Sequence, residues 1–130
     1  MYLIDSSIWI DFLNDKTNQK TDTCIALNQS GLTHLICTEV LQGAVSQKIF
    51  DIYQTYLSVQ PFYDFKDDKK SYQQAAQVYF NCRKQGVTIR STIECLIAQC
   101  AIENNLILLH NDKDFNQIAK IYPSLEVQQA

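Results

Sequence analysis

Five acidic residues stand where strands of a parallel sheet would end, or in the first turn of a following helix: Asp5, Glu39, Glu94, Asp112 and Asp114. Ligands of open parallel sheets collect beyond the carboxyl ends of the strands, so we expect these acids to share one edge. Carboxylates crowded into one pocket repel one another unless a divalent cation lies between them. The pattern therefore predicts a metal site with oxygen ligands, which favours Mg²⁺ or Mn²⁺ and chemistry at a phosphate.

Each acid also has a purely structural explanation. Asp5 alone is equally well explained as a turn or N-cap residue, and Glu39 and Glu94 are favourably placed on a helix dipole. Asp112 and Asp114 suit a turn, in which one of them caps the last helix. Only their joint placement favours a functional site.

Other polar residues carry weaker signals. His110 follows an apolar run and His34 lies within one, and because no paired Ser or Cys nucleophile is in view, both are expected to be packed or surface histidines. Arg90 precedes the expected cap of an apolar helix, where it could reach a phosphate at the sheet edge.

The elements that would position the acids alternate between strands and helices, which predicts a three-layer α/β/α sandwich with a mostly parallel central sheet. Ser6 and Ser7, Thr38, and Ser91 or Thr92 are the expected helix caps, and Gly86 is the expected stop of the fourth helix. We expect strands over residues 2–5, 32–37, 106–110 and 125–127, with 59–62 a short edge piece, and helices over 8–13, 21–28, 38–57, 68–84, 93–103 and 112–122.

Composition is that of one ordinary globular domain spanning residues 1–130, with 46% hydrophobic and 19% charged residues. The formal net charge of −3 argues against a protein that holds nucleic acid on a broadly basic surface. A phosphate partner therefore requires metal ions or a few well-placed cations.

The five cysteines are odd in number and show no C-x-x-C spacing, which indicates free, buried thiols in a reducing compartment. The first residues carry no basic segment, and no apolar run approaches the roughly 20 residues that a membrane span needs. We expect a cytoplasmic protein without a membrane partner.

Four segments, taken together, resemble the PIN-domain toxins of the VapC type. The opening Tyr-Leu-Ile-Asp-Ser-Ser-Ile-Trp carries Asp5, and Thr-Glu-Val-Leu-Gln-Gly carries Glu39. Ile-Arg-Ser-Thr-Ile-Glu-Cys-Leu-Ile-Ala carries Glu94, and Leu-Leu-His-Asn-Asp-Lys-Asp-Phe carries Asp112 and Asp114. The segments occur in order over nearly the whole chain, which makes the match specific even though each acid motif alone is weak.

The resemblance implies a Mg²⁺- or Mn²⁺-dependent endoribonuclease, usually dimeric and silenced by a VapB antitoxin. It implies that Asp5, Glu39, Glu94 and Asp112 hold the metal or its waters, with Asp114 as the alternate fourth acid. It also implies a hydroxyl that supports Asp5, for which Ser7 is the better match, and Ser7 and Arg90 are the expected substrate contacts. We further expect part of the partner surface around Ile8, Trp9, Phe12 and Leu13.

One position departs from the family, whose third acid is normally Asp where this chain has Glu94. The additional methylene displaces the carboxylate by about 1.5 Å, and Mg²⁺ geometry tolerates little displacement. The departure predicts weakened cleavage and leaves two alternatives open: a catalytically silent module that only binds an antitoxin, and a receiver-like phosphoacceptor domain. The second fits less well, because it requires paired acids after the first strand and a Lys after the last.

Overall fold

The computed structural model describes residues 1–16 and 19–130. Within these residues the chain forms four strands, β1 (Tyr2–Ile4), β2 (Ser30–Gly31), β3 (Ile107–His110) and β4 (Glu126–Gln129). The helices are α1 (Ser6–Leu13), α2 (Gln19–Ala26), α3 (His34–Gln42), α4 (Gln47–Ser58), α5 (Asp68–Lys84), α6 (Thr92–Glu103) and α7 (Lys113–Ile121).

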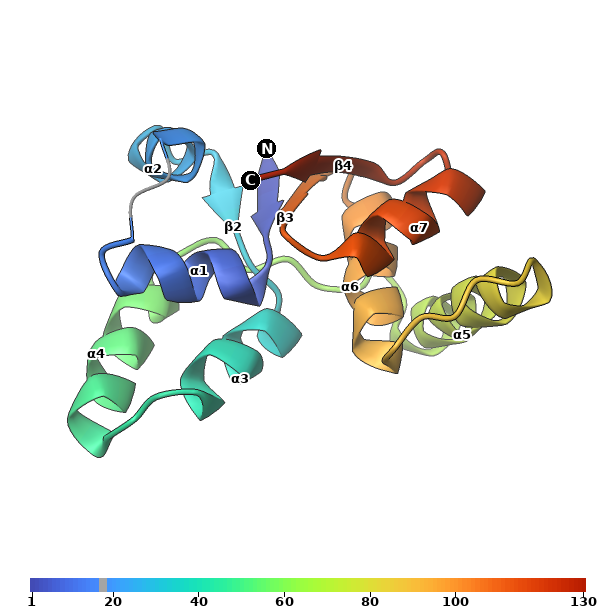
Figure 1. Ribbon diagram of the computed structural model, residues 1–130. Helices are drawn as coiled ribbons and strands as arrows, with labels where there is room; N and C mark the ends of the chain where they lie inside the picture. The colour runs from blue at the N-terminus through green and yellow to red at the C-terminus, as the bar shows by residue number, and fades with distance from the viewer. Residues whose placement is uncertain (17–18) are drawn as a thin grey trace.

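All four strands are parallel and lie in the order β2-β1-β3-β4. Tyr2 is in register with Ser30 on one side and with Ile107 on the other. Helices cover both sides of the sheet: α1 to α4 gather on the left and α5 to α7 on the right of Figure 1. The arrangement confirms the predicted three-layer fold with a parallel sheet.

The central strands are covered on both faces. Leu3, Ile4, Leu108 and Leu109 are completely buried, as expected of a continuous apolar run in a parallel sheet. Burial of each such side chain stabilises the fold by about 1.5–3 kcal/mol. Because the two strands are anchored in the core, the acids that follow them leave the sheet from fixed points.

The predicted strand over residues 32–37 is wrong, since this segment begins helix α3. Helix α3 starts at His34, and Ile36 and Val40 are fully buried four residues apart on one face of it. The Thr33 hydroxyl accepts a hydrogen bond from the Ile36 backbone N–H at 3.1 Å and caps the helix. A high local content of apolar residues concealed this helical period.

The predicted helix over residues 38–57 is two helices, α3 and α4, with a break between them. Thr38 is not a cap: it lies inside α3, and its hydroxyl donates to the His34 carbonyl at 2.8 Å. Ser46 opens α4 by accepting from the Ile49 N–H at 3.2 Å. Of the expected edge piece over 59–62, Phe62 alone forms a bridge, parallel to Leu32.

The expected cap at Ser6 or Ser7 is wrong, because both serines lie inside α1 and Asp5 stands at the N-cap position. The other helix and strand ends agree with the predictions within two residues. Gly86 follows α5 with φ +80°, a conformation that suits glycine, and Ser91 caps α6 by accepting from the Ile93 N–H at 3.1 Å. The last strand is β4, one to two residues later than expected. The exposed apolar face expected on the first helix is wrong for Ile8 and Trp9, which are only 3% and 0% exposed and belong to the core, whereas Phe12 and Leu13 are partly exposed.

All five cysteines are free thiols, as predicted. Burial raises the pKa of Cys95 to about 12 and that of Cys100 to about 11, so both stay protonated near neutral pH. No helix in the described part of the chain is long and apolar enough to cross a membrane.

Candidate active site

Asp5 stands where β1 passes into α1, at the N-cap position of that helix. Its backbone carbonyl accepts from the Ile8 and Trp9 N–H groups, both at 3.1 Å, but its side chain makes no capping hydrogen bond. The carboxyl is 7% exposed, and burial raises its pKa to about 7. The backbone N–H of Ser6 lowers the pKa, and the nearby acids Glu39, Asp112 and Glu94 raise it. The Asp5 carboxyl therefore faces other acids rather than serving the helix.

Glu39 reaches the same pocket from the interior of α3 and not from the end of a strand. Burial, followed by the charge of Glu94, raises the pKa of this half-buried carboxyl. The Ser6 hydroxyl donates a hydrogen bond to Glu39 and lowers its pKa. Ser7, the hydroxyl expected from the sequence, lies exposed one residue further along α1.

Asp112 stands between β3 and α7, at the N-cap position of that helix, and Asp114 lies in its first turn. Asp112 caps α7: its Oδ1 accepts from the Asp114 N–H at 2.9 Å. Asp114 is 3% exposed. His110 Nδ1 accepts a hydrogen bond from the Asp112 N–H at 3.0 Å, which fixes the backbone between β3 and α7. One of the two acids thus caps the helix, and both carboxylates remain directed toward the site.

His110 is a packed histidine, in agreement with the prediction. It is completely buried and packs edge-on against Phe115, with ring centroids 5.3 Å apart. Burial lowers the pKa of His110, which keeps the ring neutral, and Nδ1 acts as an acceptor. Its role is to position the Asp112 backbone.

Glu94 extends from the first turn of α6 toward these two acids. Glu94, Asp112 and Asp114 each offer an oxygen within 4.8 Å of the others, a spacing that oxygen ligands of one divalent ion share. Glu94 Oε2 is buried and has no hydrogen-bond partner among the described residues. A buried carboxylate oxygen without a partner is costly, so the residues present fit a bound cation.

Arg90 closes the pocket on the side of Asp112 and Asp114. Its Nη2 donates to Asp112 Oδ1 at 2.7 Å, and its Nε donates to Asp114 Oδ2 at 3.0 Å. The Arg90 backbone N–H also donates to Asp114 Oδ2, at 3.2 Å. The arginine expected to meet a phosphate therefore meets two of the acids.

The fold brings the five predicted acids to one edge, where β1 and β3 end beside the starts of α1, α6 and α7 (Figure 1). Two positioning residues, Ser6 and His110, were not assigned a role in the acidic pocket from the sequence. The signal for Ser6 was present in the pair of serines after Asp5, but the phase of α1 decides which of them faces the pocket.

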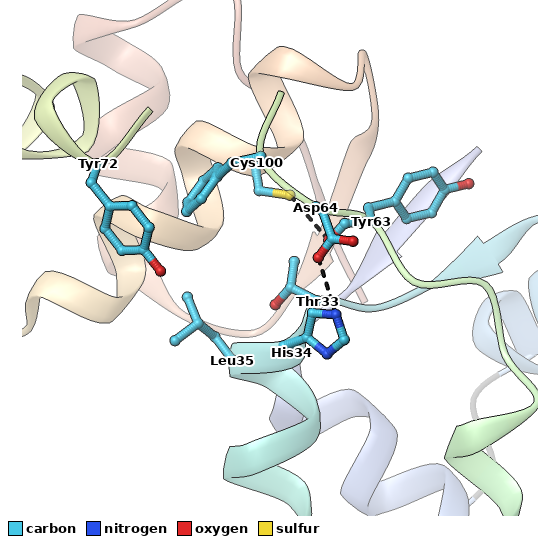
Figure 2. A pocket seen from close by; sticks show the side chains of 8 residues that line it. Thr33, His34, Leu35, Tyr63, Asp64, Tyr72 and Cys100 are labelled. Atoms are coloured by element: carbon cyan, nitrogen blue, oxygen red, sulfur yellow. Dashed lines mark hydrogen bonds and ion pairs between the residues drawn. The ribbon is translucent and has the colours of Figure 1, made fainter. Parts of the chain in front are cut away.

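A second pocket lies away from these acids, between the start of α3, the 63–65 segment and the last turns of α6 (Figure 2). In it, His34 Nε2 lies 3.1 Å from Asp64 Oδ1, and the Cys100 thiol donates to the Tyr63 carbonyl at 3.6 Å. Both His34 and Asp64 are largely exposed, with 71% and 68% of their side chains accessible. Tyr63, Phe65 and Tyr72 line this small pocket together with a single acid, Asp64, so it offers no group of acids comparable with the sheet edge.

Comparison with known proteins gives a consistent result. The PIN domain family matches residues 2–121. Ribonuclease VapC11 of Mycobacterium tuberculosis and VapC ribonuclease Mb1587 of Mycobacterium bovis are each 29% identical to this chain over 126 residues, covering 93% of both sequences.

Solved structures share the fold. The VapBC2 structure from Rickettsia felis, bound to a DNA fragment from its promoter, superposes with a TM-score of 0.79 at 19% identity, covering 99% of this chain and 98% of the other. DNA-bound VapBC from Salmonella typhimurium gives a TM-score of 0.76 at 13% identity, with 98% and 96% covered.

Proposed function

The chain belongs to the PIN-domain family, and on that basis we propose that it is a metal-dependent endoribonuclease, the toxin of a VapBC-type toxin–antitoxin pair. One observation carries the proposal: five carboxylates from four separate segments converge, and a buried Glu94 oxygen is left without a partner. If these acids served only to stabilise the fold, the buried Glu94 oxygen would be expected to accept a hydrogen bond from a neighbouring group.

Asp5, Glu94, Asp112 and Asp114 are the residues proposed to hold Mg²⁺ or Mn²⁺, with Glu39 beside them. When bound, the ion would supply Lewis-acid stabilisation of the phosphate charge and a lowered pKa for a water molecule. The protein's part is to keep these carboxylates in place: β1 fixes Asp5, Ser6 orients Glu39, and His110 holds the turn that carries Asp112.

RNA would be engaged locally, because the overall charge of −3 gives no broad attraction for a polyanion. Arg90, whose side chain is 63% exposed, forms ion pairs with two of the acids, Asp112 and Asp114. Ser7 lies exposed in the first turn of α1 and is the proposed second contact. Both residues are proposed to contact the RNA.

The proposed partner is a VapB-type antitoxin, as in the VapBC structures that share this fold. Apolar side chains stay exposed along α4 and at its ends, where Val45 is 91%, Ile52 51% and Val59 79% exposed. Such side chains suit a protein partner. A homodimer and a cytoplasmic location complete the proposal, the latter supported by five free thiols.

Cleavage of RNA tests the nuclease proposal directly. The purified chain is incubated with labelled single-stranded and structured RNAs in Mg²⁺, in Mn²⁺ and in EDTA, and products are mapped on gels. Glu39→Gln removes one acid of the pocket, and Glu126→Gln, an exposed acid on β4, is the matched control. Metal-dependent products from wild type and the control, and their loss from Glu39→Gln, are expected. Equal products in EDTA would contradict the proposal.

A silent antitoxin-binding module is the second candidate, and the Glu94 departure favours it. It predicts a stable complex with the antitoxin and no cleavage with any metal. Co-expression with the product of a neighbouring gene, followed by co-purification and the same RNA assay, separates the two candidates. The receiver-like alternative finds no support in the family match.

A further inference from the structure

Arg90 connects the acidic pocket with solvent. Its side chain is 63% exposed, whereas the side chains of its partners Asp112 and Asp114 are only 19% and 4% exposed. The guanidinium therefore lies over two largely buried carboxylates. Such charge-assisted contacts to buried acids are stronger than ordinary surface ion pairs.

The backbone on both sides of Arg90 is fixed. Ile89 is 2% exposed and belongs to the core, and Ser91 caps α6. Asp114 Oδ2 accepts from both the backbone N–H and the Nε of Arg90, so Asp114 keeps a partner even when the guanidinium moves. Among the described residues, Asp112 Oδ1 accepts only from the exposed Nη2 end of the Arg90 side chain and from the cap N–H of Asp114.

These contacts use two of the three carboxylates that would hold a metal. Asp112 and Asp114 lie with Glu94 in the group whose oxygens are within 4.8 Å of one another. A guanidinium and a divalent cation are both positive and compete for the same carboxylates. The uncompensated oxygen in this group belongs to Glu94, which Arg90 does not contact in the described structure.

We propose that Arg90 is a tethered counter-cation that holds Asp112 when no metal is bound and gives up that carboxylate when a divalent ion enters. The inference rests on the proposed metal site and adds regulation to it. Arg90 lowers the affinity for metal. When no metal is bound, its positive charge offsets the repulsion between the carboxylates and keeps them close together. Its guanidinium, once released on the solvent side, is free to meet a phosphate.

Metal affinity distinguishes this role from simple support of the acids. Isothermal titration of the full chain with Mn²⁺ compares wild type with Arg90→Gln, Arg90→Lys and the control Arg83→Gln, an exposed arginine on α5. Loss of the competing cation makes Arg90→Gln bind Mn²⁺ about tenfold more tightly, because one charged hydrogen bond need no longer be broken. Arg90→Lys keeps the charge and stays closer to wild type, and Arg83→Gln is unchanged.

Weaker or unaltered Mn²⁺ binding by Arg90→Gln would overturn the proposal, since a residue that supports the ligands loses affinity when removed. If neither protein binds Mn²⁺, the proposed metal site fails together with the inference. Tighter binding by Arg90→Gln without any RNA cleavage supports the counter-cation role and contradicts only the nuclease proposal.

A second measurement uses wild-type protein and does not depend on the folding of a variant. The chain has two arginines, Arg83 and Arg90, so its Nε–H region in a ¹H–¹⁵N spectrum holds two signals, which Arg83→Gln assigns. Saturation with diamagnetic Mg²⁺ is expected to shift the Arg90 signal and leave that of Arg83 in place. An Arg90 signal that does not move at saturation would contradict displacement.

Discussion

The acidic pocket has two sides that carry the same charge and compensate it differently. On one side, Asp112 and Asp114 accept hydrogen bonds from Arg90, and Asp112 also accepts from the N–H of Asp114. On the other side, Asp5 receives the Ser6 N–H and Glu39 the Ser6 hydroxyl. Only the first side has an arginine within hydrogen-bond reach in the described structure.

The difference explains where electrostatic strain resides. Burial and the neighbouring acids raise the pKa of Asp5 to about 7 and raise that of Glu39 as well. A proton or a cation can relieve this side, and no basic side chain does so in the described structure. We infer that the Arg90 side keeps the pocket assembled and that the Asp5 side supplies most of the drive to bind a divalent ion.

Replacement of Asp5 is expected to have the largest effect. Asp5→Asn removes the uncompensated charge and should lower metal-dependent RNA cleavage by at least about a hundredfold, because Asp5 is a proposed ligand of the ion. The same change should raise the free energy of unfolding in EDTA at pH 8, because no buried charge remains to be repelled. Cleavage kinetics and urea unfolding measure the two effects.

Asp11→Asn, on the same helix and 47% exposed at its side chain, is the matched control and should alter neither quantity. If Asp5→Asn lost activity and stability together, Asp5 would be a structural residue, and the contrast between the two sides of the pocket would be incorrect.

The pH dependence of the free energy of unfolding tests the same contrast between the two sides of the pocket and requires no activity assay. An unfolded Asp loses its proton near pH 4, whereas folded Asp5 keeps it to about pH 7. Between these values the folded state binds more protons, so the Asp5 contribution to stability falls as pH rises from 4 to 7 and is constant above. The expected loss is of the order of 3 kcal/mol.

Urea unfolding in EDTA at pH 5 and pH 8 measures this loss. Asp5→Asn should flatten the profile, and Asp11→Asn should retain it. A wild-type chain whose stability rises over this interval would show that Asp5 is compensated in the folded state, as Asp112 is. Addition of Mn²⁺ at pH 8 should restore stability by binding only the folded form.

Glu94 lies between the two sides, and shortening it has an intermediate expected effect. Glu94→Asp draws the carboxylate back by about 1.5 Å toward α6 and gives the residue that the family normally has. We expect cleavage in Mg²⁺ or Mn²⁺ to rise about tenfold. The exposed Glu126→Asp is the control, and equal rates for wild type and Glu94→Asp would show that the longer side chain is no hindrance.

How far the sequence predicted this site depends on the kind of contact involved. Asp5, Asp112 and Asp114 follow buried parallel strands. Because the carboxyl ends of such strands lie at one edge of the sheet, the local sequence pattern was enough to predict that these acids lie close together. Glu39 was placed correctly for an incorrect reason. The segment before it is a helix, and tertiary packing of α3, rather than the end of a strand, carries this residue to the pocket.

Two features depend on geometry that a linear pattern does not contain. Successive residues of a helix point about 100° apart, so the choice between Ser6 and Ser7 depends on the phase in which α1 leaves Asp5. The pairing of Arg90 with Asp112 and Asp114 joins residues 22 and 24 positions apart. The sequence indicated that Arg90 could reach a phosphate at the sheet edge. Its pairing with the two acids depends on how α6 and α7 pack, which the sequence pattern does not show.

The two serines allow the smallest and most local of these tests. The Ser6 hydroxyl donates to Glu39 on the side that lacks an arginine, so Ser6→Ala removes a modest part of the compensation there and raises the pKa of Glu39 further. We expect Mn²⁺ affinity to change by about two- to fivefold, the effect of one hydrogen bond. Ser7→Ala, exposed on the same helix, should leave Mn²⁺ affinity unaltered and change only the apparent KM for RNA. Equal changes in Mn²⁺ affinity for both variants would mean that the helix as a whole, and not the Ser6 hydroxyl, stabilises this side of the pocket.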